Sequence, residues 1–120
     1  MLLKSNFYHI INASQEDGQV ANTIELNAAH PIFQGHFPEQ PVVPGVCMMQ
    51  LITEILESAV QRKVLLQKAG MMKFLQMIDP VKQPLVDVTV TYKEEEAGLK
   101  VSATLKRDDK TFMKFQGIFK

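Results

Sequence analysis

One segment of the chain constrains the fold more than any other, because it is the only one with the pattern of a long helix. Residues 44–62 read PGVCMMQLITEILESAVQR, with proline suited to the first helical position. Apolar residues cover most of the helix circumference. The polar residues form a narrow stripe at helical spacing: Gln50, Thr53, Glu54, Glu57 and Gln61. A helix that is apolar on nearly all sides must be nearly surrounded by other elements.

The remaining apolar segments are typical of strands, because apolar and polar residues alternate in them. A hairpin is predicted around the Asp-Gly pair of EDGQ at 16–19. Short polar links predict that the last three strands are antiparallel neighbours. The predicted strands are 6–15, 20–27, 85–92, 99–106 and 111–119. Residues 28–43 are predicted to be a loop.

Two apolar runs flank Gly70, and they form either one strand bent at the glycine or two pieces. The element order predicts an α+β fold in one domain spanning residues 1–120, with one helix and a mostly antiparallel sheet. Since only one helix is available, we expect the sheet to curl around it, which is the arrangement of a hot-dog fold.

Composition excludes several classes of function. The chain has 120 residues, 13 basic and 13 acidic, so a clustered basic excess for nucleic acid or an anionic membrane is not expected. No apolar run approaches the roughly 18–20 residues that span a bilayer. Cys47 is the only cysteine, which excludes an intrachain disulfide and favours a cytoplasmic location. We expect neither a metal nor a cofactor.

The loop before the helix carries the most specific motif. Residues 35–46 read GHFPEQPVVPGV, and NAAHPIFQ precedes them. The motif resembles that of the single-domain hot-dog 3-hydroxyacyl-[acyl carrier protein] dehydratases, of which the chain would be a divergent member. The resemblance implies removal of water from a 3-hydroxyacyl thioester, an acyl carrier protein as partner, and a homodimer or dimer-based oligomer with sites at the subunit interface.

The residue types of the motif suit this chemistry. His36 matches the family's catalytic base, and a histidine pKa near neutrality fits removal of a C2 proton. Gly45 and Val46 lie in the first helical turn, where unpaired N–H groups can bind the thioester oxygen. The prolines of the loop restrict its conformations and would hold these groups in place. Candidates for the acyl-chain lining are Phe33, Phe37, Met48, Met49, Met72 and Phe74.

The family's acid lies fourteen residues after the motif histidine, and here that position is Gln50. A carboxamide donates a hydrogen bond but delivers no proton at neutral pH. Glu54 lies one turn later on the same face. Either Glu54 reaches the site, directly or through water, or it belongs to a solvated polar stripe. For His9, His30 and Cys47 we expect structural roles.

Three functions remain open from the sequence. The first is a dehydratase in fatty-acid or polyene lipid synthesis, with His36 as base and Gln50 positioning the hydroxyl. The second is an acyl-thioester hydrolase in which Glu54 activates water. The third is a non-catalytic acyl-thioester binding module, which the missing acid motivates.

Overall fold

A computed structural model describes residues 3–35 and 40–120 of the chain. Its single sheet has six strands in the order β1-β2-β4-β5-β6-β3, and all its pairings are antiparallel. The elements are β1 (Tyr8–Glu16), β2 (Gln19–Leu26), α1 (Ile32–Gly35), α2 (Gly45–Val60), β3 (Leu66–Phe74), β4 (Leu85–Glu95), β5 (Gly98–Arg107) and β6 (Lys110–Phe119). The predicted hairpin and the three C-terminal strands are confirmed.

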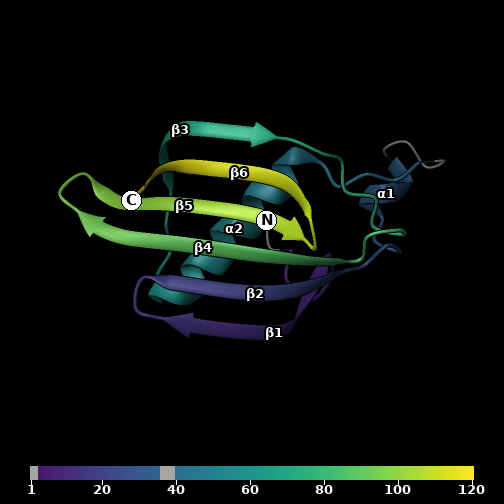
Figure 1. The fold of residues 1–120 in the computed structure, drawn as a ribbon, viewed down its shortest axis with the longest axis horizontal. Coiled ribbons are helices and arrows are strands. Elements are labelled where there is room, and N and C mark those ends of the chain that lie inside the picture. Colours follow the sequence, from purple (N-terminus) through teal and green to yellow (C-terminus); the bar gives the residue numbers. More distant parts are fainter. Residues whose placement is uncertain (1–2, 36–39) are drawn as a thin grey trace.

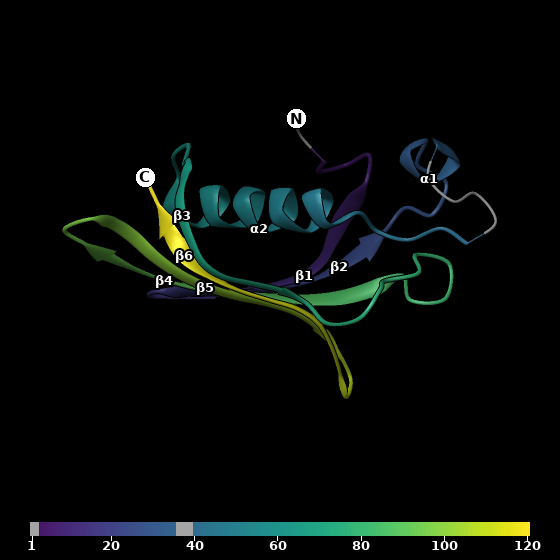
Figure 2. The same ribbon diagram turned by 90° about the horizontal axis from the view of Figure 1, so that it is seen from above.

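The sheet curves around α2, which lies along its concave face (Figures 1 and 2). Inward side chains of β2, β4, β5 and β6 pack against the apolar side chains of the helix. Ile52 and Leu56 of α2 are fully buried, as are Val88 and Val90 of β4. The α+β hot-dog arrangement is therefore confirmed, and burial of one apolar helix is what bends the sheet.

The segment predicted as a loop contains the short helix α1. His30 begins this turn, because its Nδ1 accepts a hydrogen bond from the Ile32 N–H at 3.1 Å. Its carbonyl also accepts from the Phe33 N–H at 3.1 Å. The Phe33 ring packs against Phe7 with centroids 5.4 Å apart. Burial of this aromatic side chain therefore stabilises a turn that the apolar pattern of the sequence does not predict.

Pro44 is the N-cap of α2 and lies just before the helix, whereas the sequence predicted it at the first helical position. Its backbone is extended (φ −63°, ψ 146°), while its carbonyl already accepts the first helical hydrogen bonds. This is the geometry of a cap residue, and the fixed φ of proline is compatible with it. The first helical residue is therefore Gly45.

The two apolar runs around Gly70 share one strand, β3, which pairs with β6 at the edge of the sheet. The pairing register shifts between Leu66 and Lys68 and again between Ala69 and Met71. Gly70 lies in the second irregularity, so the bent-strand alternative is correct.

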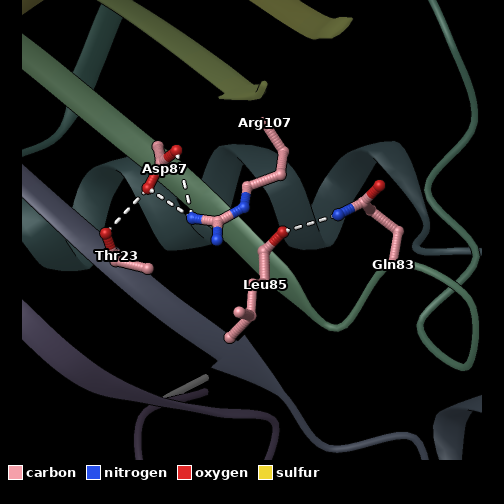
Figure 3. A network of polar contacts seen from close by, with 5 residues as sticks. All are labelled: Thr23, Gln83, Leu85, Asp87 and Arg107. Carbon is pink, nitrogen blue, oxygen red and sulfur yellow. Dashed lines mark hydrogen bonds and ion pairs between the residues drawn. The ribbon is translucent and has the colours of Figure 1, made fainter. Parts of the chain in front are cut away.

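A polar network on the outer face of the sheet joins three strands (Figure 3). Asp87 of β4 accepts a hydrogen bond from Thr23 of β2 at 2.7 Å and bonds from Arg107 of β5 at 3.3 and 3.4 Å. Nearby, Gln83 donates to the Leu85 carbonyl at 3.0 Å. Because the network links β2, β4 and β5, it helps to fix the register of the central strands.

One inward position of the sheet breaks the apolar pattern. Asn22 of β2 is 7% exposed, and its Oδ1 has no hydrogen-bond partner among the described residues. A buried acceptor without a partner costs about 1–3 kcal/mol.

We predict that Asn22→Val raises the free energy of unfolding by about 1 kcal/mol or more in urea denaturation. Thr89→Val on the outer face controls for strand propensity, and a destabilised Asn22→Val variant would contradict the prediction.

Candidate functional site

The start of α2 presents two unpaired backbone donors. The Pro44 carbonyl accepts from the N–H groups of Cys47 at 3.0 Å and Met48 at 3.2 Å. Among residues 3–35 and 40–120, nothing accepts a hydrogen bond from the N–H of Gly45 or Val46. Together with the helix dipole, these two groups can bind an oxygen that gains negative charge.

An apolar hollow of about 600 Å³ adjoins these donors. The ring of Phe74 lies directly over Gly45, because a Cβ built on Gly45 would be 2.9 Å from the Phe74 Cζ. Glycine is therefore what lets the ring approach the backbone at the helix start. The hollow is lined by Val42, Val43, Pro44, Gly45, Met48, Phe74, Leu75, Gln76 and Met77. Its size and apolar lining suit part of an acyl chain.

Val46, Gln50 and Glu54 are spaced four residues apart, so they lie along one face of α2. Val46 is 69% exposed, Gln50 is half-buried and Glu54 is 8% exposed. One helical turn, about 5.4 Å, separates each from the next. The face therefore runs from the open donors at the helix start, past the Gln50 amide, to a buried carboxylate.

The Glu54 carboxylate accepts four hydrogen bonds. Its Oε2 accepts from the Leu3 N–H at 2.7 Å and from Gln50 Nε2 at 2.9 Å. Its Oε1 accepts from the Lys4 N–H at 3.0 Å and from the Tyr8 hydroxyl at 3.1 Å. An ionised carboxylate has about four acceptor positions, so all of them are occupied.

The expectation that Glu54 is a solvated residue of a polar stripe is wrong. The N-terminal segment, with Leu3 and Tyr8 each 2% exposed, covers this part of the helix. Tyr8 lies within the predicted strand 6–15, and nothing in the sequence pattern assigned it a partner. The signal that was available is the helix pattern itself, because one acid within a buried helix needs donors from elsewhere in the chain.

The other predicted site residues divide into three groups. His36 and Phe37 lie outside the described residues. Phe74 lines the apolar hollow, as expected for a residue that contacts an acyl chain. Phe33 does not line it: the side chain is 3% exposed and packs in the core.

The remaining histidines and the cysteine have structural contacts. His9 lies 2.9 Å from Glu25 on the neighbouring strand, and His30 supports α1. Cys47 is fully buried, and burial raises the pKa of its thiol, which disfavours the reactive thiolate. Across the described part of the chain there is no group of three potential metal ligands, and no helix is long and apolar enough to cross a membrane.

Comparison with known proteins gives consistent matches. Residues 12–116 match the model of the ApeI-like family, described as ApeI dehydratase. A 3-hydroxyacyl-[acyl-carrier-protein] dehydratase FabZ from Pelotomaculum thermopropionicum is 42% identical over 67 residues, covering 55% of this chain and 46% of the relative. The corresponding protein of Thermoanaerobacter sp. is 39% identical over 46 residues, covering 38% of this chain and 32% of the relative. The matches thus span less than half of each relative.

Solved structures share the fold. The dehydratase heterocomplex ApeI:P from Xenorhabdus doucetiae contains a chain with a TM-score of 0.75 and 20% identity, covering 92% of this chain and 95% of that one. An uncharacterized protein from Erwinia carotovora subsp. atroseptica has a TM-score of 0.69 and 19% identity, covering 94% and 91%. At these identities the likeness establishes the hot-dog architecture.

Tyr8 generates a testable pH dependence. Burial, and then the charge and hydrogen bond of Glu54, raise the pKa of its hydroxyl well above the ordinary value of 10.0. The unfolded chain ionises this group above about pH 10 while the folded chain does not. Stability from Tyr8 is therefore complete below pH 10 and decreases as the pH rises towards the folded-state pKa.

We predict that the wild type loses up to about 1.4 kcal/mol more unfolding free energy per pH unit above pH 10 than Tyr8→Phe. Urea denaturation between pH 9 and 11 measures this difference. Equal slopes for the two proteins would show that Tyr8 titrates normally in the fold.

Proposed function

Because the chain belongs to the ApeI-like dehydratase family, we propose that it is a dehydratase of 3-hydroxyacyl thioesters carried by an acyl carrier protein. One observation carries the proposal: the N–H groups of Gly45 and Val46 have no acceptor among the described residues, and Gly45 lines an apolar hollow of about 600 Å³. Donors for a thioester oxygen and room for an acyl chain therefore occur together. The relatives' names support an acyl carrier protein as partner. We propose that the reaction belongs to fatty-acid or polyene lipid synthesis.

In the proposed reaction His36 removes a proton from C2, as its place in the motif implies. Negative charge then develops on the thioester oxygen, where the Gly45 and Val46 N–H groups stabilise it. The C3–O bond breaks, a double bond forms between C2 and C3, and the leaving hydroxide takes up a proton to become water. Phe74 and Met48 contact the acyl chain from the wall of the hollow.

Gln50 lies one turn from the Val46 N–H and can hydrogen-bond the 3-hydroxyl. Its amide delivers no proton, so the proton for the leaving group comes from water or from the protonated base in this proposal. Glu54 is a poor acid here, because all four of its acceptor positions are occupied and it is 8% exposed.

The same contacts argue against an acyl-thioester hydrolase. A carboxylate that activates water must accept a hydrogen bond from that water. Glu54 has no acceptor position left, and it is the helix carboxylate that such a mechanism would use. A non-catalytic acyl-thioester binding module uses the same donors and hollow, so only turnover separates it from the dehydratase.

We predict conversion of a 3-hydroxyacyl thioester, on a carrier protein or on pantetheine, to the trans-2-enoyl thioester, measured by absorbance and mass spectrometry. His36→Ala should lower kcat by about 10²–10⁴-fold, because it removes the base. His9→Ala is the matched control, since His9 lies on β1 in an exposed contact with Glu25. Binding without any product would favour the binding module, and free thiol release would favour the hydrolase.

We also propose that the chain forms a homodimer through the β3 edge. β3 pairs with β6 on one side only, and an exposed apolar band follows its free edge and the loop after it. The band consists of Leu66, Met72, Phe74, Leu75 and Met77, which are 36–77% exposed. An unpaired apolar edge of this kind is a template for pairing with another chain.

We predict that the wild type sediments as a dimer and that the double variant Met72→Lys with Met77→Lys dissociates. Each introduced charge would lose its hydration in the interface without gaining a partner, so the dimer dissociation constant should rise at least tenfold. Ile11→Lys is the control, because Ile11 is also apolar and 50% exposed but lies at the opposite edge of the sheet. A monomeric wild type, or dissociation of the control, would contradict this interface.

A further inference from the structure

Glu54 differs from the rest of the polar stripe because its environment is built around one charge. Two backbone N–H groups, a phenol and an amide all donate to it within 2.7–3.1 Å. Hydrogen bonds to a charged group in a site of low dielectric are stronger than neutral ones. The carboxylate is thus held in one orientation by segments that are 46 to 51 residues away in sequence.

The charge on Glu54 determines which way the Gln50 amide points. An ionised carboxylate only accepts hydrogen bonds, so the amide must turn its Nε2 towards Glu54. The observed distance of 2.9 Å agrees with this orientation. The carbonyl oxygen Oε1 is then on the opposite side of the amide. Glu54 is one of at least two polar contacts of Gln50, so its side chain is constrained at more than one point.

We propose that Glu54 is a positioning residue that holds Gln50 as a hydrogen-bond acceptor for the substrate's 3-hydroxyl. This inference rests on the proposed function, and it extends it by assigning a direction to the contact: the hydroxyl donates and the Gln50 Oε1 accepts. The hydroxyl is thereby oriented relative to the thioester oxygen bound at the start of α2. Gln50 selects for a 3-hydroxy group and takes no part in proton delivery.

The arrangement also explains how glutamine can occupy a position where a carboxylic acid would be functional. The side chain at position 50 donates to Glu54, and of a glutamine and an ionised glutamate only the glutamine can do so. If a carboxyl group is placed there, two carboxyl groups about 3 Å apart cannot both ionise.

The first test is Glu54→Gln, which removes the charge that orients Gln50. An amide misplaced by about 1 Å can cost about 10²-fold in rate, so we expect kcat for the 3-hydroxyacyl thioester to fall at least tenfold. Glu57→Gln is the matched control: it is the same substitution on the same helix. Glu57 also accepts a backbone N–H, from Val64 at 3.0 Å, and lies about two helical turns from Gln50. Its kcat should stay within about twofold of the wild type.

A second variant keeps the proposal testable if Glu54→Gln does not fold. In Gln50→Glu the introduced carboxyl group lies beside the Glu54 carboxylate, so ionisation of both groups would drive it away from its place beside Glu54 and kcat should fall as the pH rises. The wild type should lack this alkaline limb. Unchanged kcat in folded Glu54→Gln, or identical pH profiles for Gln50→Glu and the wild type, would overturn the proposal.

A readout that does not need turnover separates this inference from the proposed function. The side-chain amide protons of Gln50, assigned in NMR spectra by their loss in Gln50→Glu, should exchange slowly with solvent in the wild type. Exchange should accelerate at least tenfold in Glu54→Gln and stay slow in Glu57→Gln. Slow exchange without turnover in the wild type would refute the dehydratase alone, and rapid exchange in the wild type would refute the role of Glu54.

Discussion

The structure depends on the burial of a single apolar helix by a single sheet. α2 is the only long helix in the described part of the chain, so the concave face of the sheet must supply nearly all of its packing partners. Fully buried residues such as Ile52 and Val88 lie where the two layers meet. Each buried side chain of this kind contributes about 1.5–3 kcal/mol of hydrophobic stabilisation, so the curvature of the sheet and the position of the helix are not independent.

This arrangement also creates the site. The sheet runs along one side of α2 (Figure 2), and the first backbone donors of the helix, which have no acceptor among the described residues, lie beside the hollow. The flank of the helix that the sheet does not reach is covered by the N-terminal segment, which the Glu54 carboxylate binds. Gln50 lies between these two regions, and its surroundings therefore combine an open helix terminus with a rigid, buried charge.

The fold was largely predictable because its signals are periodic and local. Alternating apolar residues located the strands, and the Asp-Gly pair located the first turn. What escaped prediction depends on contacts between distant segments. The α1 turn is stabilised by Phe33 packing on Phe7, and Glu54 is buried through donors about 50 residues away. Neither interaction leaves a local pattern, so the motif identified candidate residues but not which of them are fixed by neighbours.

Two of the four hydrogen bonds to Glu54 come from the main chain, at Leu3 and Lys4. Any residue except proline provides such an N–H group, so natural sequences can vary at both positions without losing the contact. The side chains at positions 3 and 4 can therefore change while the backbone of the N-terminal segment keeps its path. In a comparison of homologues, an acid at position 54 would look like an isolated residue at these two contacts, because its main-chain donors leave no trace in the sequence.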